Sequence, residues 1–512
     1  MNGNPILPQR SQHIGFQLRD NRKPTNKRSR CLGLHCGAVA LCTFSWFFLP
    51  PSESLMLNGF VVSITYLTLG LIEARRGPPW LTPLAIFFFF FAVQMGIAAI
   101  YEGYALGVTP WLQFSRWMIP VKDLATGYLV SLVGMFAMHA GLEASRHGLS
   151  STPPLRPQQS KFPFLTFGIL WALGLFATYL PLIVVHLGTL GVFFQYGGLA
   201  ALLPLAFLDA RQLNISRVTH GVLFAAGTFG LLAASAASQN SSKMTIVLAL
   251  LPTAGLLVRT KRYRKLLPIP AVAGLLLYLA VIAPAINGSR TIATLRGMTA
   301  WDKVVQSAET NSLLAGAKPA SDFLLEQFGS LMDRIFESPT ATGFLVSEVE
   351  RTGLQMGNTM LGLEYAFIPR VLWPEKPIVS RGAWFTTYLG MAPRAEEATS
   401  STGMTAFGEW YWNFGIVGEV LGMFLVGLLQ GGLWHLAGDY PLYDPARMLL
   451  YVAVIVNMVM LPEASTVLVT AVALYILFGT VLLFRKIANG FTGAAQTVGP
   501  RTNPRSFLRH AS

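Results

Sequence analysis

Two neighbouring stretches late in the chain gather residue types that bind anions and sugars and that transfer protons. The first stretch covers 364–384 and contributes Glu364, Arg370, Trp373, Lys376, Arg381 and Trp384. The second covers 408–418 and contributes Glu409 and Asn413. Guanidinium and ammonium groups suit a diphosphate, tryptophan rings suit the apolar faces of sugars, and a carboxylate can take a proton from a hydroxyl group.

Each of these residues also has a structural interpretation, which the sequence leaves open. Arg370 is equally suited to pair with a nearby carboxylate and so to pin the loop. Glu409 stands where the loop returns to an apolar run, and it suits a structural ion pair as well as substrate binding or catalysis. The aromatic run 410–412 is typical of a membrane-interface belt. Gly415 and Gly418 are expected to allow close helix packing.

Motifs of several other enzyme classes are absent from the sequence. The connection 287–411 contains no histidine and no cysteine, and the chain has no Gly-x-Ser-x-Gly, His-Glu-x-x-His or glycine-rich phosphate motif. Cys31, Cys36 and Cys42 lie in or beside the first apolar run and show neither a disulfide framework nor a zinc spacing. His35 is interpreted as a packing or headgroup contact. We therefore expect no metal and no cofactor.

The composition directs the chain to a membrane. Hydrophobic residues make up 53% and charged residues 12% of the chain, whereas a soluble domain has about 25% charged residues. The net charge of +14 is spread over short segments between apolar runs and an N-terminal tail. That distribution is typical of the positive-inside rule and of contact with anionic lipids. It does not favour nucleic-acid binding, which needs basic residues on one folded face.

Apolar runs of about twenty residues predict an all-α polytopic membrane protein with about twelve spanning helices. These runs lie near 32–49, 54–73, 81–101, 122–143, 162–185, 188–208, 218–237, 243–259, 267–286, 412–436, 446–461 and 465–484. A Pro- and Ser-rich linker at 148–160 separates two halves of the chain.

Basic residues on alternate connections predict the topology. The tail 1–31 and the tail 485–512 are basic and are expected in the cytoplasm. Helices occupy 32–286 and 412–484, and the connection 287–411 is expected to form one large loop on the outer side. The first apolar run is expected to act as a signal anchor, because the basic tail is too long for a cleavable signal peptide.

Within the outer loop, apolar residues of Asp322–Ser338 recur at helical spacing and predict an amphipathic helix. Such a helix can pack on the membrane domain or lie at the membrane interface.

Two motifs resemble a known family. Ile368–Pro377 follows the pattern Ile-Pro-Arg-x-x-Trp-Pro-x-Lys-Pro, and Gly408–Gly418 follows Gly-Glu-x-x-x-Asn-x-Gly-x-x-Gly. Together with the expected topology, they resemble the bacterial O-antigen and exopolysaccharide repeat-unit polymerases. The resemblance in topology covers nearly the whole chain, whereas the sequence motifs cover these two stretches.

The resemblance implies a glycosyltransferase of the GT-C class in the bacterial inner membrane. Such an enzyme joins oligosaccharide repeat units carried on undecaprenyl diphosphate, on the periplasmic side, into O-antigen or exopolysaccharide. Because the donor is already activated by its diphosphate, no nucleotide, metal or other cofactor is implied. Membrane lipids and a polysaccharide chain-length regulator are the implied partners, and nucleic acid is not one.

The resemblance also implies roles for individual residues. Glu409 is the first choice as general base, Arg370 neutralises the leaving diphosphate, and Arg334 is a second catalytic cation. The residues assigned to substrate binding are Lys376, Arg381, Trp373, Glu364 and Asn413. Glu364 is in addition the runner-up base.

Two other functions remain open. An O-antigen ligase resembles this topology, but ligases of that family feature a histidine in the large loop. This loop has none, although His186 lies in another outer connection. A lipid-glycan flippase or transporter would place ionisable groups inside its helices. The apolar runs hold few, chiefly His139, His220 and His435.

Overall fold

The structure is a computed structural model. It describes residues 25–74, 83–108, 118–148, 163–179, 189–237, 319–361, 363, 368, 372–375, 381–390, 393–394, 403–438 and 441–496. The predicted helices 243–259 and 267–286 lie outside the described residues, as does nearly all of the linker 148–160.

The described part of the chain is helical and contains no strand. Its first half holds α1 (Thr25–Phe48), α2 (Pro51–Ala74), α3 (Pro83–Phe91), the π-helical η1 (Ala92–Ile97), α4 (Ala98–Val108), α5 (Val121–Gly148), α6 (Phe164–Tyr179), α8 (Thr189–Phe207) and α9 (Arg217–Ala237). Its second half holds α14 (Ala320–Ile335), α15 (Glu337–Thr352), the 3-10 turn η4 (Asn358–Met360), α17 (Arg381–Tyr388), α18 (Ala406–Ala437), the 3-10 turn η6 (Pro441–Tyr443), α19 (Pro445–Met460) and α20 (Ala464–Gln496).

Every predicted spanning range within the described residues falls on a helix. The largest difference is at α20, which continues to Gln496 rather than ending near 484. α18 begins at Ala406 rather than near 412. The amphipathic helix predicted for Asp322–Ser338 is α14, which ends at Ile335, and α15 follows at once.

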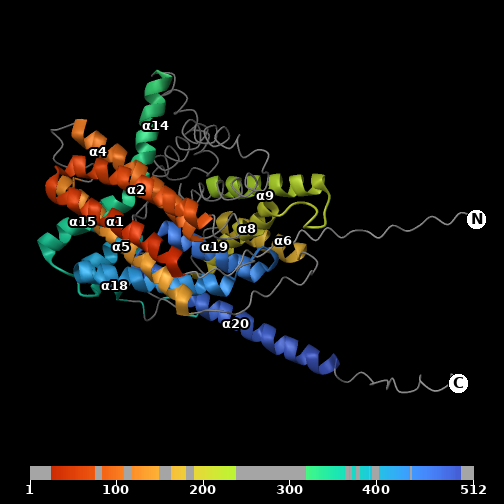
Figure 1. Cartoon of the computed structure of the whole chain (residues 1–512). Helices are drawn as coiled ribbons and strands as arrows, with labels where there is room; N and C mark the ends of the chain where they lie inside the picture. Colours follow the sequence, from red (N-terminus) through yellow and green to blue (C-terminus); the bar gives the residue numbers. More distant parts are fainter. Residues whose placement is uncertain are drawn as a thin grey trace, which may run out of the picture.

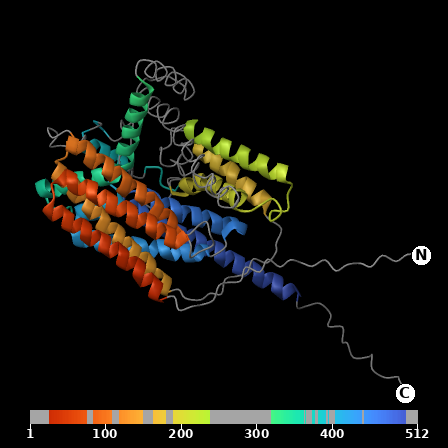
Figure 2. The ribbon, with the colours of Figure 1, turned by 45° about the horizontal axis from the view of Figure 1, so that its top comes forward.

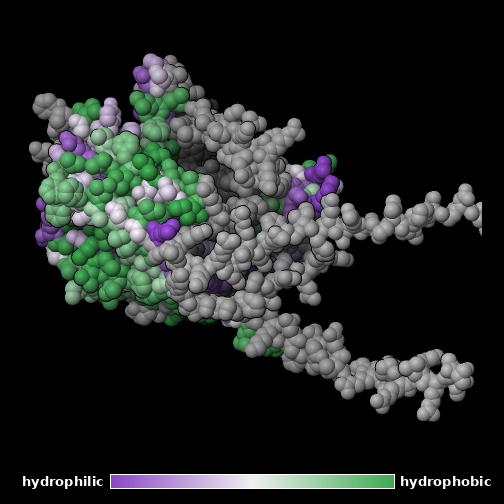
Figure 3. All heavy atoms as spheres, in the orientation of Figure 1, coloured by the Kyte–Doolittle hydropathy of each residue, from purple (hydrophilic) through white to green (hydrophobic). Residues whose placement is uncertain are grey.

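Within the described residues, six helical stretches are long and apolar enough to cross a membrane: Arg30–Phe48, Pro51–Ala74, Pro83–Val108, Val121–Ser145, Ala406–Ala437 and Ala464–Val481. Large apolar side chains such as Phe44, Phe47 and Ile64 are exposed. Hydrophobic residues also spread over much of the described surface in Figure 3. A surface of this kind needs lipid around it. The chain is therefore a multi-pass membrane protein.

α5 lies among the helices that position the candidate site. It packs against α1, α2, α15 and α18 (Figure 1). A second group, α6, α8 and α9, is joined to the first through contacts of α8 with α19 (Figure 2). α14 packs against α4 and projects away from the other helices in both views.

Glycines let α5 and α18 approach each other closely. A Cβ atom at Gly141 would overlap the carbonyl oxygen of Phe424, and one at Gly427 would overlap the carbonyl oxygen of Met138. Small residues permit such backbone contact in a membrane, where van der Waals packing rather than the hydrophobic effect holds helices together. This contact fixes α18 against α5.

α18 is broken at Gly415. This glycine has φ 65° and ψ −160°, a conformation that residues with a Cβ atom rarely adopt. The break folds residues 406–414 back against residues 416–437, so that a Cβ atom at Gly422 would overlap the ring of Trp410. Residues 416–437 alone remain long enough to cross a hydrocarbon core of about 30 Å.

The two glycines singled out in this motif therefore act differently. A Cβ atom at Gly418 would overlap the side chain of Phe414, which confirms the prediction that Gly418 allows close packing. Gly415 instead supplies the backbone conformation of the break.

Candidate functional site

Glu409 and Asn413 lie in the first segment of α18, and both are 0% exposed. Thr405 caps this segment, because its hydroxyl accepts a hydrogen bond from the N–H of Gly408 at 3.2 Å. Glu409 thus stands in the first turn, where the helix dipole favours a negative charge. Asn413 follows one turn later on the same face, and its Nδ2 donates to the backbone carbonyl of Glu409 at 2.7 Å.

Both oxygens of the Glu409 carboxyl group accept hydrogen bonds. Oε1 accepts from the hydroxyl of Thr359 at 2.9 Å. Oε2 accepts from the N–H of Ser465 at 3.0 Å and from its hydroxyl at 3.2 Å. Thr359 belongs to the predicted outer loop and Ser465 to the start of α20, so one carboxyl group joins three segments that are distant in sequence.

Asn413 adds two bonds to the same loop segment. Its Oδ1 accepts from the N–H of Gly357 at 2.9 Å, and its Nδ2 donates to the hydroxyl of Thr359 at 2.6 Å. Glu409, Asn413, Thr359 and Ser465 are called the Glu409 node below. The term loop end is used below for one end of the helix bundle. This end holds the Glu409 node, α15 and the turn between α19 and α20.

The break at Gly415 also helps to bind the loop. Because of the break, the carbonyl oxygens of Trp412 and Asn413 find no backbone N–H donor in the next turn of the helix. These oxygens accept from the N–H groups of Gln355 at 2.9 Å and Met356 at 3.0 Å. Loop backbone therefore completes the end of the helix segment.

The structure describes only some of the other predicted site residues. Outside the described residues lie Glu364, Arg370 and Lys376. Arg334 lies near the end of α14 and Arg381 begins α17, and of these two residues only the backbone is described. Trp373 is exposed. The described residues thus bring Glu409 and Asn413 together, and the cations stay predictions.

An ion pair on α15 was not predicted. Glu348 accepts from Arg351 through two bonds, from Nε at 3.1 Å and from Nη2 at 2.7 Å, and it accepts a third from the hydroxyl of Tyr388 at 2.7 Å. Burial acts to raise the pKa of Glu348, but these hydrogen bonds and the Arg351 charge outweigh it and lower the pKa. Glu348 is therefore ionised at neutral pH. The spacing of Glu348 and Arg351, three residues on a helix, is a signal that the sequence carried.

An aromatic cluster covers the loop end. Trp412 is 1% exposed and packs against Tyr388, with ring centroids 5.2 Å apart, and against Phe385. The prediction that the run 410–412 forms an interfacial belt is therefore wrong for Trp412, because the folded-back segment turns this ring into the protein. Trp384 contacts it from α17 at 6.1 Å.

Two histidines meet inside the membrane helices. Nδ1 of His35 on α1 lies 3.1 Å from Nδ1 of His139 on α5, and Nε2 of His35 lies 2.8 Å from the hydroxyl of Tyr66. His35 is 0% exposed, so it contacts neighbouring side chains and not lipid headgroups. Among the described residues no group of three or more His, Cys, Asp or Glu is placed to hold a metal ion.

A second buried glutamate on α18 was also missed. Glu419 is 0% exposed, and neither carboxyl oxygen has a hydrogen-bond partner in the described structure. The group lies against α5 at Gly134, where a Cβ atom would overlap Oε1 of Glu419 and lie 2.8 Å from Cδ1 of Phe407. Histidines are therefore not the chief ionisable residues of the helices by themselves, because the buried Glu419 has to be counted with them.

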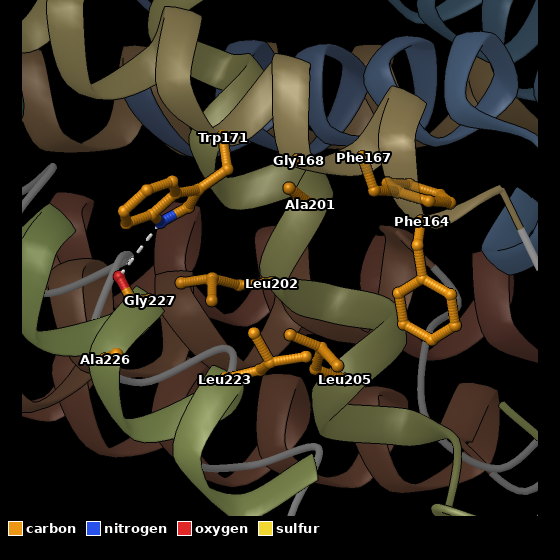
Figure 4. Close-up of a pocket in the computed structure, with 10 residues that line it drawn as sticks. All are labelled: Phe164, Phe167, Gly168, Trp171, Ala201, Leu202, Leu205, Leu223, Ala226 and Gly227. Carbon is orange, nitrogen blue, oxygen red and sulfur yellow. Dashed lines mark hydrogen bonds between the residues drawn. The ribbon is translucent and has the colours of Figure 1, made fainter. Parts of the chain in front are cut away.

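An apolar cavity of about 160 Å³ lies between α6, α8 and α9. Figure 4 shows the residues that line it. Its most polar lining group is the indole N–H of Trp171, which donates to the carbonyl oxygen of Gly227 at 3.2 Å. The cavity lacks the charged and polar groups that the predicted chemistry needs, so the loop end remains the candidate site.

No protein-family model, curated protein or solved structure matches this chain.

Proposed function

We propose that this protein is a bacterial membrane glycosyltransferase that polymerises undecaprenyl-diphosphate-linked oligosaccharide repeat units on the periplasmic side. The resemblance of Ile368–Pro377 and Gly408–Gly418 to the repeat-unit polymerases supports this proposal. The observation that carries it is the Glu409 node. Glu409 and Asn413 of the second motif bind the predicted outer-loop segment to the ends of membrane helices. A diphosphate carried on a membrane lipid would lie at this level.

The proposed reaction balances without a further reactant. A hydroxyl oxygen of the acceptor unit bonds to the anomeric carbon of the donor glycan, and the bond from that carbon to the diphosphate breaks. Undecaprenyl diphosphate leaves with the electron pair, and the acceptor proton passes to a carboxylate. Arginine and lysine stabilise the charge that grows on the leaving group.

We assign the leaving diphosphate to Arg370, with Lys376 and Arg381 in support and Arg334 as a second catalytic cation. Trp373 and Glu364 complete the substrate-binding set from the loop. In the structure, Oε1 of Glu409 is occupied by the hydroxyl of Thr359 at 2.9 Å. On our proposal, the acceptor hydroxyl takes the place of this hydroxyl when substrate binds, and Glu409 receives its proton while Asn413 holds the loop.

A deletion strain tests the proposal, with surface glycans and lipid-linked glycans analysed by gel electrophoresis and mass spectrometry. A polymerase predicts single repeat units on lipid A core or on the carrier, without long polymer. Long polymer that accumulates on undecaprenyl diphosphate would contradict the proposal and indicate a ligase.

A lipid-glycan flippase is the second candidate, and one observation favours it. Glu419 and the His35–His139 pair are buried inside membrane helices, where ionisable groups are costly and usually functional. In the deletion strain, a flippase predicts lipid-linked single units that stay on the cytoplasmic face. That result would remove the proposed roles of the loop residues.

A further inference from the structure

α17 presents two aromatic rings as one surface at the loop end. Trp384 and Tyr388 are one helical turn apart, and their rings stack with centroids 5.5 Å apart and an interplanar angle of 29°. Each residue is 37% exposed. Beneath them, the buried Trp412 contacts both rings. The pair is therefore supported from inside and open on its outer side.

A charged pair lies at the edge of this aromatic surface. The hydroxyl of Tyr388 donates to Oε2 of Glu348 at 2.7 Å, and Arg351 holds the same carboxylate through Nε and Nη2. The Arg351 side chain is 66% exposed. Arginine has five N–H donors, so donors remain for a ligand after these two bonds. The carboxylate and the guanidinium group are thus fixed in place beside the rings.

This combination suits a pyranose ring. A sugar presents an apolar face of C–H groups, which packs on an aromatic ring, and hydroxyl groups at its edge, which both donate and accept hydrogen bonds. Glu348 can accept from such a hydroxyl, and Arg351 can donate to it.

A membrane-interface role suits the same residues less well. A belt tyrosine keeps its hydroxyl toward water and headgroups, whereas the hydroxyl of Tyr388 is bound to Glu348. An acyl chain beside the rings would also meet a charged pair.

We propose that Trp384, Tyr388, Glu348 and Arg351 form a carbohydrate-binding subsite that takes one pyranose ring of the glycan. The identity of that glycan, a lipid-linked repeat unit, rests on the proposed function. The subsite adjoins the Glu409 node through Trp412, the residue before Asn413. A sugar held there lies beside the loop segment that Glu409 and Asn413 bind.

Two substitutions at one position test the subsite. Trp384→Phe keeps a flat ring, whereas Trp384→Leu keeps an apolar side chain without an aromatic face. The full-length protein in nanodiscs would be titrated calorimetrically with the soluble oligosaccharide released by mild acid from the cell's own lipid-linked glycans. We expect Trp384→Phe to bind within about threefold of the unsubstituted protein. We expect Trp384→Leu to bind about tenfold more weakly, which corresponds to about 1.4 kcal/mol, because leucine has no flat face for the C–H groups of the sugar.

Tyr388→Phe supplies a second measurement, because it keeps the ring and removes the bond to Glu348. We expect weaker binding together with a small fall in unfolding temperature, because one hydrogen bond to the carboxylate is lost. Equal binding by the unsubstituted protein and Trp384→Leu would overturn the subsite, as would failure of the unsubstituted protein to bind. A lower unfolding temperature for Trp384→Leu with unchanged sugar affinity would assign the rings to packing or lipid contact, and this also overturns it.

The same experiments separate the two proposals. If the deletion strain makes normal polymer while Trp384→Leu weakens sugar binding, the proposed polymerase fails and the subsite stands. If the deletion strain loses polymer and a plasmid copy of Trp384→Leu restores normal polymer, the polymerase stands and the subsite fails.

Discussion

Glu409 and Glu419 lie on the same helix and are equally buried, yet their surroundings are opposite. Each oxygen of Glu409 accepts at least one hydrogen bond, from Thr359 or from Ser465. Neither oxygen of Glu419 has a hydrogen-bond partner in the described structure, and the group rests against the backbone at Gly134. The break at Gly415 separates the two glutamates.

The comparison shows that burial alone does not define a role for a carboxyl group. A buried carboxylate is stable when donors surround it, and a buried carboxyl group without donors is expected in its neutral form. Glu409 therefore suits a role that needs accepting oxygens in a fixed position. Glu419 suits a role that needs a proton held inside the membrane.

The largest effect is expected from Glu409→Gln. Glutamine keeps the shape, but its amide NH2 group cannot accept the bonds that one carboxylate oxygen accepts. A buried donor left without a partner costs about 1–3 kcal/mol. We expect a lower unfolding temperature in detergent and no long polymer when the variant replaces the native protein. Normal polymer together with a normal unfolding temperature would remove Glu409 from both the mechanism and the node.

Thr359→Val serves as the matched control for Glu409→Gln. It removes one donor to Glu409 and the hydroxyl oxygen that accepts from Nδ2 of Asn413, and it leaves the carboxylate in place. If Glu409 is the general base, Thr359→Val still makes polymer, whereas Glu409→Gln makes none even when the two variants have the same unfolding temperature. If both variants lose polymer in proportion to their loss of stability, Glu409 is a positioning residue.

Gly134→Ala is expected to have the next largest effect. The new Cβ atom would overlap Oε1 of Glu419 and crowd Phe407, and overpacking of this kind costs about 1–3 kcal/mol. The unfolding temperature should fall, and Glu419→Ala in the same chain should restore part of it.

Gly37→Ala is the control for this substitution, because a Cβ atom at Gly37 meets no atom within 4 Å. Alanine is also a better helix former than glycine, by up to about 1 kcal/mol. Equal unfolding temperatures for Gly134→Ala and Gly37→Ala would show that Glu419 does not occupy this position.

Glu419→Gln is expected to change stability little, because an amide replaces a neutral acid of the same shape. A hydrophobic carbodiimide reacts with protonated carboxyl groups in apolar surroundings, so mass spectrometry should find its adduct on Glu419. The adduct should be absent from Glu419→Gln. An adduct on Glu409 alone would reverse the comparison between the two glutamates.

The smallest effect is expected at Glu348. Its folded pKa lies below the ordinary value of 4.5, so its contribution to stability is present above pH 4.5 and is lost as the pH falls through the folded pKa. We expect the unfolding temperature of the native protein to fall over this range, and Glu348→Gln to reduce that fall. Parallel curves for the two proteins would contradict the ion pair with Arg351.

The positions of the helices were predictable because hydrophobic length is a strong signal. The ranges near 54–73 and 446–461 correspond to α2 and α19 within a few residues. The break in α18 was not predictable. Gly415 and Gly418 have the same residue type and similar surroundings in sequence, and the sequence alone does not show that Gly415 is the one that leaves the helix.

The candidate site was predictable in its residues and less so in its contacts. Glu409 and Asn413 were found by their place in a motif, but their partners Thr359 and Ser465 stand in unremarkable stretches of sequence. Glu348 and Arg351 showed helical spacing, whereas Tyr388 reaches them only through tertiary packing. Glu419 was passed over because an apolar run with one glutamate still has the composition of a membrane helix.

Reconstitution tests the central claim most directly. The purified full-length protein in nanodiscs would be incubated with lipid-linked single repeat units extracted from the deletion strain, and the products would be resolved by mass spectrometry. We predict glycans of two and more repeat units on one carrier, one free undecaprenyl diphosphate for each bond formed, and no product from Arg370→Ala. Unchanged single units in the presence of the folded native protein would contradict the proposed polymerase.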